Sequence, residues 1–405
     1  MPFFIKILYI LFLGLQIVLI SYFLQPFILL LIYLIKKKKD NHPLRPADKS
    51  YHFAAIITAH RDSRFIRPLV DSLLKQTYHN FMVYVVADEC NIADLHFNDP
   101  RIILLRPDKG LNAKIKSISH AIENFKIPPD ALIIFDSDNL VHPDYLSVVN
   151  QYYNNGFKVI QTNMQPKNKD NVYSRLDAAY DMYHNFTDRE VRMLLGLSSN
   201  IWGLGIVIDT GLYKEITYEH ALGGFDKKLQ MDLVLKTKIA YAEEALVYDE
   251  KVTDGKVLER QRSRWIYAYF KHVKYAWKVF ITGMKKKKVD LVFFGYNLMG
   301  PPLIVQMICC CLMLTIDWWI NPAFSILWIS AFSIYVIAFT GIIAIKDKSR
   351  QILYSLPYLP LFVFRLLKAF LRINAASKNF LKTEHNQIIY IDELLKNEIP
   401  EKNIF

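Results

Sequence analysis

The feature that most constrains this chain is an almost unbroken apolar run over Phe3–Ile35, in which Lys6 is the only charged residue. About 20 apolar residues are enough for a helix to cross a bilayer, so this run can span one with some tilt. A cleavable signal peptide is the competing interpretation. Its apolar region would be only about 7–15 residues long and would end at a small-residue cleavage site. We therefore expect an N-terminal membrane helix.

Two blocks of lysine bracket the middle of the chain, at Lys36–Lys39 and at Lys285–Lys288. Basic residues beside membrane helices collect on the cytoplasmic side, so both blocks predict a cytoplasmic location for the region between them and an N-terminus that faces outward. The blocks also account for part of the formal net charge of +12. Nucleic-acid binding would need basic residues interleaved with exposed aromatic residues on one face, and the sequence does not have that organisation.

Further apolar runs follow the second lysine block. The runs Leu291–Ile316 and Ala323–Ile345 are each long enough to span a bilayer, and Asp317–Pro322 is expected to be the turn between them. The segment Ile352–Ile373 contains two prolines and three basic residues at near-helical spacing. It fits a kinked span and a basic helix lying on the cytoplasmic surface equally well, so two or three C-terminal membrane helices are expected.

The expected organisation has four parts. They are an N-terminal membrane helix with its basic flank (1–39), a cytoplasmic domain that ends in an interfacial helix (40–284), C-terminal transmembrane or interfacial helices (285–375) and a polar tail (376–405). The hydrophobic fraction of 52% supports this division, because an ordinary soluble domain of this size would have a lower one. The expected location is therefore an inner or plasma membrane.

The cytoplasmic part alternates strand-like and helix-like segments. Short β-rich apolar runs and amphipathic stretches follow one another as Phe53–Ala59, Phe65–Gln76, Phe81–Ala87, Arg101–Leu105, Ala113–Phe125 and Ala131–Phe135. Continuous apolar strands separated by amphipathic segments are typical of an α/β fold with a parallel sheet covered on both faces. Ligands bind such sheets beyond the carboxyl ends of the strands, which is where we expect the chemistry.

Two carboxylates, Asp136 and Asp138, follow the last of these strands. Burying the strand would leave both acids at its exposed carboxyl tip, because an unpaired charge is costly inside a core. Their spacing suits a hard divalent cation, which prefers oxygen ligands and readily keeps phosphate oxygens among them. A D-x-D alone is also compatible with a solvated turn, and the buried strand in front of it favours the functional interpretation.

Asp88 also stands at the end of an apolar strand. By itself it fits a helix cap or a turn as well as a functional site. Two strands that end in acids at one edge of one sheet are harder to explain by turn chemistry alone. We therefore include Asp88 among the candidate site residues.

Asp232 follows a glycine pair, Gly223-Gly224, in the stretch that leads into an amphipathic helix. Locally this is an ordinary helix start, and the structural interpretation is favoured. The functional alternative makes Asp232 a general base, which would remove the proton of a sugar hydroxyl as that hydroxyl attacks.

The run Gln261-Arg262-Ser263-Arg264-Trp265 combines a cation with an indole ring. Arginine can neutralise a leaving diphosphate, and tryptophan can stack on a sugar face. A basic, aromatic helix at a membrane interface would have the same composition, so composition does not separate the two interpretations.

Taken together, these residues resemble family 2 glycosyltransferases, in particular the branch of cellulose, hyaluronan, chitin and poly-N-acetylglucosamine synthases. That branch has, in order, a lone Asp, a D-x-D, an acidic pair and Q-x-x-R-W. This chain offers Asp88, Asp136 with Asp138, Asp232, and Gln261–Trp265. Similar segments also occur at Ser72–Tyr78 and before the Q-x-x-R-W run, so that the resemblance covers roughly residues 50 to 280.

The resemblance implies a GT-A fold and an inverting transfer from a nucleoside-diphosphate sugar. It implies that Asp88, Asp136 and Arg264 bind the donor and that Asp138 binds Mg²⁺ or Mn²⁺. Asp232 would be the catalytic base. The acceptor would meet Gln261 and Trp265 together with Gly203 and Gly205, which lie in a loop similar to the Gly-rich acceptor loop of the family.

The chain also departs from the family pattern. Met231 stands where the family has the first acid of the pair, and the acceptor loop lacks the usual basic residue shortly after it. The expected activity is polysaccharide synthesis by a membrane glycosyltransferase, with a UDP-sugar as the expected donor and an export partner subunit as a further expectation. A lipid-linked acceptor is the alternative. A non-catalytic membrane scaffold ranks lower, because Asp138, Asp232 and Arg264 are all present.

Overall fold

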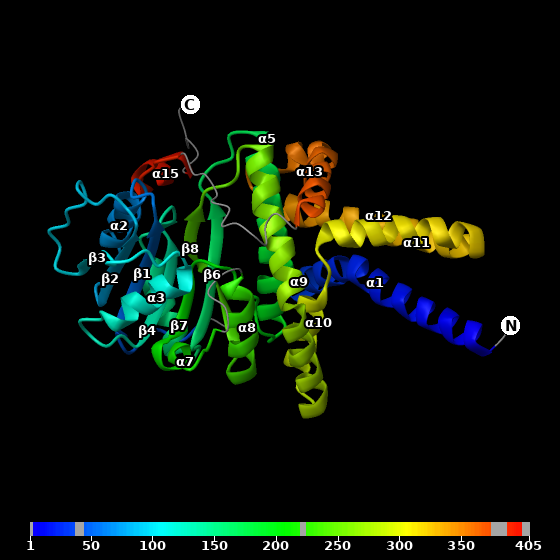
Figure 1. The fold of residues 1–405 in the computed structure, drawn as a ribbon, viewed down its shortest axis with the longest axis horizontal. Helices are drawn as coiled ribbons and strands as arrows, with labels where there is room; N and C mark the ends of the chain where they lie inside the picture. Colours follow the sequence, from blue (N-terminus) through cyan, green and yellow to red (C-terminus); the bar gives the residue numbers. More distant parts are fainter. Residues whose placement is uncertain (1–2, 37–43, 219–223, 374–386, 399–405) are drawn as a thin grey trace.

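The computed structural model describes residues 3–36, 44–218, 224–373 and 387–398. Figure 1 shows a mixed α/β domain on one side of the molecule and long helices that project from the other side. Several residues named in the sequence analysis lie outside the described ranges: Lys37–Lys39, Gly223, and the parts of the tail at 376–386 and 399–405.

Eight strands form one sheet, in the order β3-β2-β1-β4-β7-β6-β8-β5. The strands are β1 (Phe53–His60), β2 (Phe81–Asp88), β3 (Ile102–Leu105), β4 (Ala131–Asp136), β5 (Leu140–Val141), β6 (Val159–Pro166), β7 (Ile206–Asp209) and β8 (Ile239–Asp249). The first four strands are parallel, and their register pairs His60 with Asp88 and Thr58 with Asp136. The acids at the ends of β2 and β4 therefore lie at the same edge of the sheet.

The expectation of a fully parallel sheet is wrong for the second half of the domain. β7 runs antiparallel between β4 and β6, and β5 pairs antiparallel with β8. The reason is the path of the chain before β7. Gly205 donates from its backbone N–H to the carbonyl of Ile134 near the carboxyl end of β4, at 2.8 Å, so β7 enters the sheet from that edge and must run the other way.

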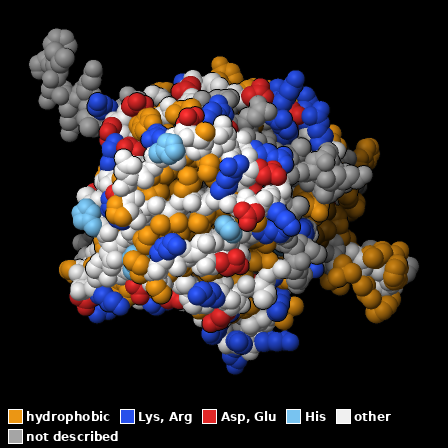
Figure 2. Space-filling model, turned by 60° about the vertical axis from the view of Figure 1, so that its left-hand side comes forward, with side chains coloured by type: hydrophobic (Ala, Val, Ile, Leu, Met, Phe, Trp, Pro, Cys, Tyr) orange, Lys and Arg blue, Asp and Glu red, His pale blue; other side chains and the backbone are white. Residues whose placement is uncertain are grey.

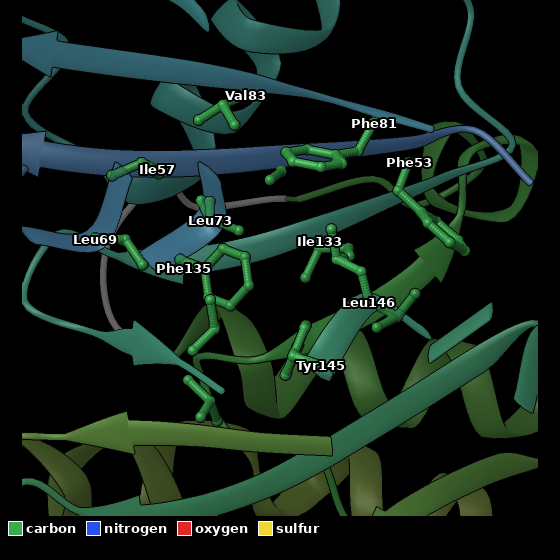
Figure 3. Close-up of a cluster of buried hydrophobic side chains, with 14 of the residues drawn as sticks. Phe53, Ile57, Leu69, Leu73, Phe81, Val83, Ile133, Phe135, Tyr145 and Leu146 are labelled. Carbon is green, nitrogen blue, oxygen red and sulfur yellow. The ribbon is translucent and has the colours of Figure 1, made fainter. Parts of the chain in front are cut away.

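Both faces of the sheet are buried, as predicted, and the side chains of the strands alternate between two cores. On one face Phe53, Ile57 and Phe135 pack against α2 (Ile66–Leu74) and α4 (Tyr145–Asn154) (Figure 3). The other face is covered by α3 (Lys114–Glu123), α7 (Thr210–Lys214), α8 (Phe225–Lys236) and the second half of α9 (Gly255–Lys286).

Four segments among the described residues are long and apolar enough to cross a membrane. They are α1 (Phe3–Lys36), α11 (Leu303–Ile320), α12 (Pro322–Lys346) and the stretch Leu353–Leu371, which comprises η2 (Leu353–Tyr358) and α13 (Leu359–Leu371). Figure 2 shows hydrophobic side chains gathered on the part of the molecule that projects away from the domain. This composition indicates a membrane-associated protein.

The projecting helices are joined by a polar contact between their buried faces. Gln16 of α1 donates to Asp317 of α11 at 3.0 Å and accepts from the indole N–H of Trp328 of α12 at 3.2 Å. Phe23 packs edge-on against Trp328 and Tyr335. The N-terminal helix therefore belongs to the same bundle as the C-terminal pair.

The predicted span Leu291–Ile316 is two helices, not one. α10 (Val289–Met299) ends before Gly300-Pro301-Pro302, and α11 begins only at Leu303. Proline lacks a backbone N–H and disfavours a helical residue before it, so the sequence Gly-Pro-Pro breaks the run. The predicted turn Asp317–Pro322 is also too long, because Asn321 alone separates α11 from α12.

The ambiguous segment 352–373 packs on the helix that carries the Q-x-x-R-W run. Arg365 and Arg372 of this segment both form ion pairs with Glu259 of α9, at 2.7 and 3.0 Å. Ser263 of α9 donates to the carbonyl of Ala369 at 2.7 Å. These contacts attach α13 to α9.

The described end of the tail forms a helix that docks on the domain. α15 (Ile391–Glu398) packs Ile391 and Leu394 against Leu140 of β5 and Tyr248 of β8. Asp392 pairs with Lys75 at 2.7 Å. The tail thus covers β5, the edge strand that directly follows the D-x-D turn.

Candidate active site

The carboxylate of Asp88 is buried at the end of β2 and organises the loop before α3. Its two oxygens accept from the backbone N–H groups of Leu111 and Asn112, both at 2.8 Å, and from Nδ1 of His60 at 3.0 Å. Asp88 therefore ties β1, β2 and the loop 110–113 together at the carboxyl edge of the sheet. Its expected contact with the donor stays a prediction.

Three non-glycine residues with left-handed backbone lie beside Asp88. Arg61, Glu89 and Asn112 have φ values of 59°, 53° and 53°. Arg61 pairs with Glu89 at 2.6 Å and donates to the side chain of Asn112 at 3.5 Å. Such conformations cost free energy and cluster at ligand sites, so we expect this rim to contribute to a binding site. Nothing in the local sequence indicated these conformations.

Lys114, the first residue of α3, joins the D-x-D turn to the acceptor loop. Its ammonium group lies 2.6 Å from Oδ1 of Asp136 and 2.6 Å from the carbonyl oxygen of Gly203. The turn itself is fixed by Asn139, whose side chain accepts from the backbone N–H of Asp136 at 2.9 Å. Sequence reasoning missed Lys114, because only the fold brings it to the end of β4.

Asp138 is buried, with 6% of the residue exposed, and its carbonyl oxygen accepts from Nζ of Lys167 at 2.7 Å. No group of three or more His, Cys, Asp or Glu residues that could hold a metal occurs among the described residues. Asp136 and Asp138 alone supply few of the six or more oxygens that a hard cation takes. The site therefore fits Mg²⁺ or Mn²⁺ when diphosphate oxygens complete the ligand set.

The helix that carries Asp232 begins beside the D-x-D turn. The ring of Phe225 at its start lies 5.2 Å from Nζ of Lys114, and Gly224 before it adopts φ +71° against Ala268 of α9. Asp232 forms an ion pair with Lys228 one turn earlier on α8. The predicted base is therefore paired with a lysine, on a helix whose first residue contacts Lys114.

The structure explains the residues that replace the usual acid before Asp232. Met231 is buried in the core between the sheet and α9. Gln230 is fully buried, and its side-chain oxygen accepts from the backbone N–H of Ile201 at 3.1 Å. The two side chains attach α8 to the sheet and to the acceptor loop and leave Asp232 on the partly exposed face of the helix.

The Q-x-x-R-W run occupies the first half of α9. Burial lowers the pKa of the Arg264 guanidinium, and the carboxylate of Asp136 acts in the opposite direction. Arg262 is buried and pairs with Asp177 of α5 (Val172–Asn185). The side-chain oxygen of Gln261 is buried without a hydrogen-bond partner among the described residues, and Trp265 is 40% exposed.

Trp265 belongs to a partly exposed aromatic cluster. The ring of Tyr180 lies 6.0 Å from Trp265 and 6.5 Å from Trp202, and 4.3 Å from His184. The buried guanidinium of Arg262 stacks on Trp265 at 3.9 Å. Trp202 directly precedes Gly203, so this cluster adjoins the D-x-D turn. Of this cluster, only Trp265 was predicted as a site residue from the sequence. Tyr180 and His184 lie on α5, whose sequence contains no recognisable motif.

His184 is fixed by an acid on the next helical turn. Its Nδ1 lies 2.7 Å from Asp188 in the short π-helix η1 (Phe186–Glu190). Burial acts to raise the pKa of Asp188, but the His184 ring together with the guanidinium groups of Arg189 and Arg192 outweighs it, and the pKa falls to about 2. Asn297 of α10 donates to Asp188 at 3.3 Å, which connects this side of the cluster to the helices near the membrane.

A buried network of charged residues links the D-x-D turn to α5, the helix that carries Tyr180 and His184. Asn139 donates to Asp249 at 3.2 Å, and Lys251 pairs with Asp249 at 2.9 Å and with Asp181 of α5. Burial alone would lower the pKa of Lys251, but the surrounding carboxylates raise it above its ordinary value, so the ammonium stays charged. The network holds α5 and the D-x-D turn in one arrangement.

The two glycines predicted at the acceptor site have different environments. A Cβ on Gly203 would meet only the Phe225 ring, at an ordinary 3.7 Å. Gly205 has φ +61°, and a Cβ there would lie 2.4 Å from Oγ1 of Thr162 and 3.0 Å from Val247. Close packing inside the sheet therefore requires glycine at 205, whereas glycine at 203 leaves room beside Lys114.

Comparison with known proteins agrees with this geometry. Residues 50–268, more than half of the chain, match the family described as "Glycosyltransferase like family 2". No curated protein sequence matches the chain at a significant level. The match to the family covers the sheet, the D-x-D turn and the Q-x-x-R-W run together.

Among solved structures, the mannosyltransferase PcManGT from Pyrobaculum calidifontis, in complex with GDP-Man and Mn²⁺, has a TM-score of 0.51 at 14% identity. The match covers 90% of this chain and 99% of that chain. TarS 1-349 from S. aureus, in complex with UDP-GlcNAc, has a TM-score of 0.43 at 14% identity and covers 81% of this chain and 90% of its own. At 14% identity the likeness to the mannosyltransferase concerns the fold, which is of the GT-A type.

Proposed function

Because the chain belongs to the family 2 glycosyltransferases, we propose that it is a membrane polysaccharide synthase that uses a nucleoside-diphosphate sugar, with UDP-sugar as the first candidate. The observation that carries the proposal is the arrangement around Asp136. Lys114 contacts its carboxylate and also the carbonyl oxygen of Gly203, and the aromatic cluster begins at Trp202, directly before Gly203. A diphosphate and a sugar ring would thus find cations and an aromatic surface side by side.

In the proposed reaction the donor enters at the carboxyl edge of the sheet. Asp88 and the rim around it hold the nucleotide, and Asp136 positions the sugar diphosphate. Asp138 is the residue that would hold Mg²⁺ or Mn²⁺ together with the diphosphate oxygens. A bound divalent cation supplies Lewis-acid stabilisation of the leaving diphosphate. Lys114 and Arg264 add positive charge at the same place.

The transfer inverts the configuration of the donor sugar. The acceptor hydroxyl oxygen bonds to the anomeric carbon, the bond from that carbon to the diphosphate oxygen breaks, and the diphosphate keeps the electron pair. Asp232 takes the hydroxyl proton. Its ion pair with Lys228 must therefore break, so that the carboxylate can contact the acceptor hydroxyl instead. Gln261, Trp265 and Gly203 line the acceptor end, where aromatic rings pack on the apolar faces of sugars.

A lipid-linked acceptor is the second candidate, and one observation supports it. Tyr183, next to His184 on α5, packs against Tyr335 and Phe339 of α12 at ring distances of 6.1 and 5.3 Å. The acceptor end therefore adjoins a helix that is long and apolar enough to span the membrane. A sugar carried on a lipid could reach the aromatic cluster without leaving the bilayer surface.

The test is transfer in purified membranes with a panel of radiolabelled UDP- and GDP-sugars, with and without Mn²⁺ or Mg²⁺. We expect metal-dependent nucleotide release from one donor, with label in a polymer that organic solvent does not extract. Label in the lipid extract would select the second candidate. If folded protein turned over no donor with either metal, the proposal would fail and a scaffold function or a missing subunit would take its place.

The cytoplasmic location of the domain is part of the proposal. The lysines at 285–288 lie at the turn between α9 and α10, and we interpret this basic block as the cytoplasmic flank that the positive-inside rule expects. A cysteine introduced at Lys126, on the exposed surface of the domain, would be labelled by an impermeant maleimide only after the cells are opened.

A further inference from the structure

The helix α5 changes its winding where it passes the aromatic cluster. It continues without a break through the π-helical segment η1 (Phe186–Glu190) into α6 (Val191–Leu194). A π-helical turn inside an α-helix is rare and occurs most often at functional sites. Asp188 lies in the middle of this turn, and His184 lies one turn before it on α5. The two residues are therefore candidates for a function that the proposed reaction does not yet use.

Asp188 is fixed from several sides. Its Oδ1 atom accepts from the hydroxyl of Thr187 at 3.1 Å and from the side-chain amide of Asn297 of α10 at 3.3 Å. Its backbone carbonyl accepts from the N–H of Asn200 at 3.0 Å, on the segment that leads into the acceptor loop. Its Oδ2 atom lies 2.7 Å from Nδ1 of His184. The carboxylate therefore holds the imidazole at a set position relative to the acceptor loop.

This carboxylate also selects the tautomer of His184. An ionised carboxylate can only accept a hydrogen bond, so Nδ1 carries the proton of the neutral ring and Nε2 is left as an acceptor. The pKa of about 2 keeps Asp188 ionised at neutral pH. Nε2 has no hydrogen-bond partner among the residues that the structure describes, and it is not fully buried. Because 24% of the side chain is exposed, a ligand can reach it.

The ring of His184 lies within the aromatic cluster. It is 4.3 Å from the ring of Tyr180 and 6.0 Å from the ring of Trp202. Trp202 is partly exposed and directly precedes Gly203 of the acceptor loop. A sugar that stacked on Trp202 would therefore have the hydroxyls at its ring edge within reach of Nε2.

Trp202 is held as firmly as the histidine. The fully buried guanidinium of Arg189 stacks on its ring at 4.0 Å and donates to the carbonyl of Asn200 at 3.2 Å. The backbone N–H of Trp202 donates to the side chain of Gln161 at 2.8 Å. An aromatic ring packs on the apolar face of a sugar, whereas a fixed polar group distinguishes one hydroxyl pattern from another. Trp202 and His184 together supply both kinds of contact.

We infer that His184 is a specificity-determining residue for the acceptor: its Nε2 accepts a hydrogen bond from one hydroxyl of a sugar that stacks on Trp202, and Asp188 is the positioning residue that orients the ring. The inference rests on the proposed function and adds to it the group by which the acceptor end selects its substrate. The acceptor class is a sugar with a free hydroxyl at that edge. A sugar with hydrogen in its place leaves Nε2 unpaired and is rejected.

The experiment measures transfer in purified membranes with the donor that the wild type uses. The acceptors are the product of the wild type, re-isolated, and analogues of it in which one hydroxyl of the terminal sugar is replaced by hydrogen. For the wild type we expect one analogue to lower kcat/KM for the acceptor by roughly 10-fold, as for a lost hydrogen bond. His184→Phe should lower kcat/KM for the natural acceptor by a similar factor and show no further loss with that analogue, because the contact is already absent.

Conservative variants separate the contact from a merely structural role. His184→Gln, whose amide reaches the position of Nε2, should keep part of the discrimination, whereas His184→Asn, whose amide reaches only the position of Nδ1, should lose it. Asp188→Asn should raise the KM for the acceptor and lose the discrimination, since the tautomer is no longer selected. The KM for the donor and its hydrolysis by water should stay near the wild type in His184→Phe. His79→Phe, an exposed histidine shortly before β2, is the matched control.

The outcomes distinguish this inference from the proposed function. If His184→Phe discriminated among the analogues as the wild type does, the hydroxyl contact would lie elsewhere and the inference would be overturned. Equal use of every analogue by the wild type would overturn it too, and the transfer activity itself would stand in both cases. If the wild type turned over no donor, the proposed function would fail, and the inference with it.

Discussion

The ammonium group of Lys114 lies 2.6 Å from a carboxylate oxygen of Asp136 and 2.6 Å from the carbonyl oxygen of Gly203. A single cation therefore holds the D-x-D turn and the acceptor loop at a fixed separation. The carboxylate of Asp136 remains partly exposed, with 39% of the side chain accessible, so a ligand can reach it. In the proposed reaction the donor diphosphate binds at this junction.

Lys114→Met should weaken donor binding by roughly 10- to 100-fold, since a hydrogen bond to a charged group contributes about 1.5–3 kcal/mol. The methionine keeps most of the side-chain volume and removes the charge. Isothermal titration with the nucleotide sugar measures the effect. Lys116→Met, two residues on and exposed, is the matched control. Equal donor affinity in the two variants would show that Lys114 has only a structural role.

Asp138→Asn should weaken donor binding in the presence of Mg²⁺ or Mn²⁺ and leave the metal-free affinity almost unchanged. The reason is that an amide is a much poorer ligand for a hard cation than a carboxylate. Donor affinity measured over a metal titration separates the two contributions. Asp94→Asn, on an exposed loop, serves as the control for the loss of one negative charge. A normal metal response in Asp138→Asn would contradict the assignment of Asp138.

Asp232→Asn should lower the transfer rate by about 100-fold or more while donor affinity stays within a few-fold of the wild type, because only the proton acceptor is lost. Single-turnover transfer and equilibrium donor binding measure the two quantities separately. Asp226→Asn, in the first turn of the same helix, should keep both. Unchanged turnover in Asp232→Asn would falsify its assignment as the base.

Gly205→Ala should destabilise the domain by about 2–5 kcal/mol. Left-handed backbone at alanine costs about 1–2 kcal/mol, and overpacking adds about 1–3 kcal/mol. Gly196→Ala isolates the first contribution, because Gly196 has φ +74° and open space around its Cα. Thermal unfolding in detergent should show a clearly larger drop for Gly205→Ala. Equal drops would mean that the contact with Thr162 relaxes at no cost.

The first half of the domain could be predicted from the sequence almost residue by residue. The run Phe53–Ala59 became β1 (Phe53–His60), and Ala113–Phe125 became α3 (Lys114–Glu123). These elements could be predicted because each is buried along its length, and burial requires a continuous or periodic pattern of apolar residues. The direction of β7 could not be predicted, since it depends on the point at which the preceding loop enters the sheet.

The candidate site, like the fold, could be predicted from the sequence only in part. Asp88 and Asp136 could be placed at one edge because each follows a buried strand, and the register confirms their positions. Lys114 and the cluster around Tyr180 could not be predicted. Lys114 contacts Gly203 across 89 residues of sequence, and no local pattern indicates a contact of that range. The break at Gly300-Pro301-Pro302, in contrast, was readable from its prolines.

The contact of Gln16 with Asp317 and Trp328 has a consequence for the order in which the protein is made. These partners lie 301 and 312 residues after Gln16. Chains are synthesised from the N-terminus, and domains generally fold as units in that order. Gln16 of α1 therefore cannot meet these two partners until the sheet domain and then α11 and α12 have been synthesised. The bundle therefore closes only after all eight strands have been made, and a truncation before residue 303 would remove both partners of Gln16 while leaving every strand of the sheet in the chain.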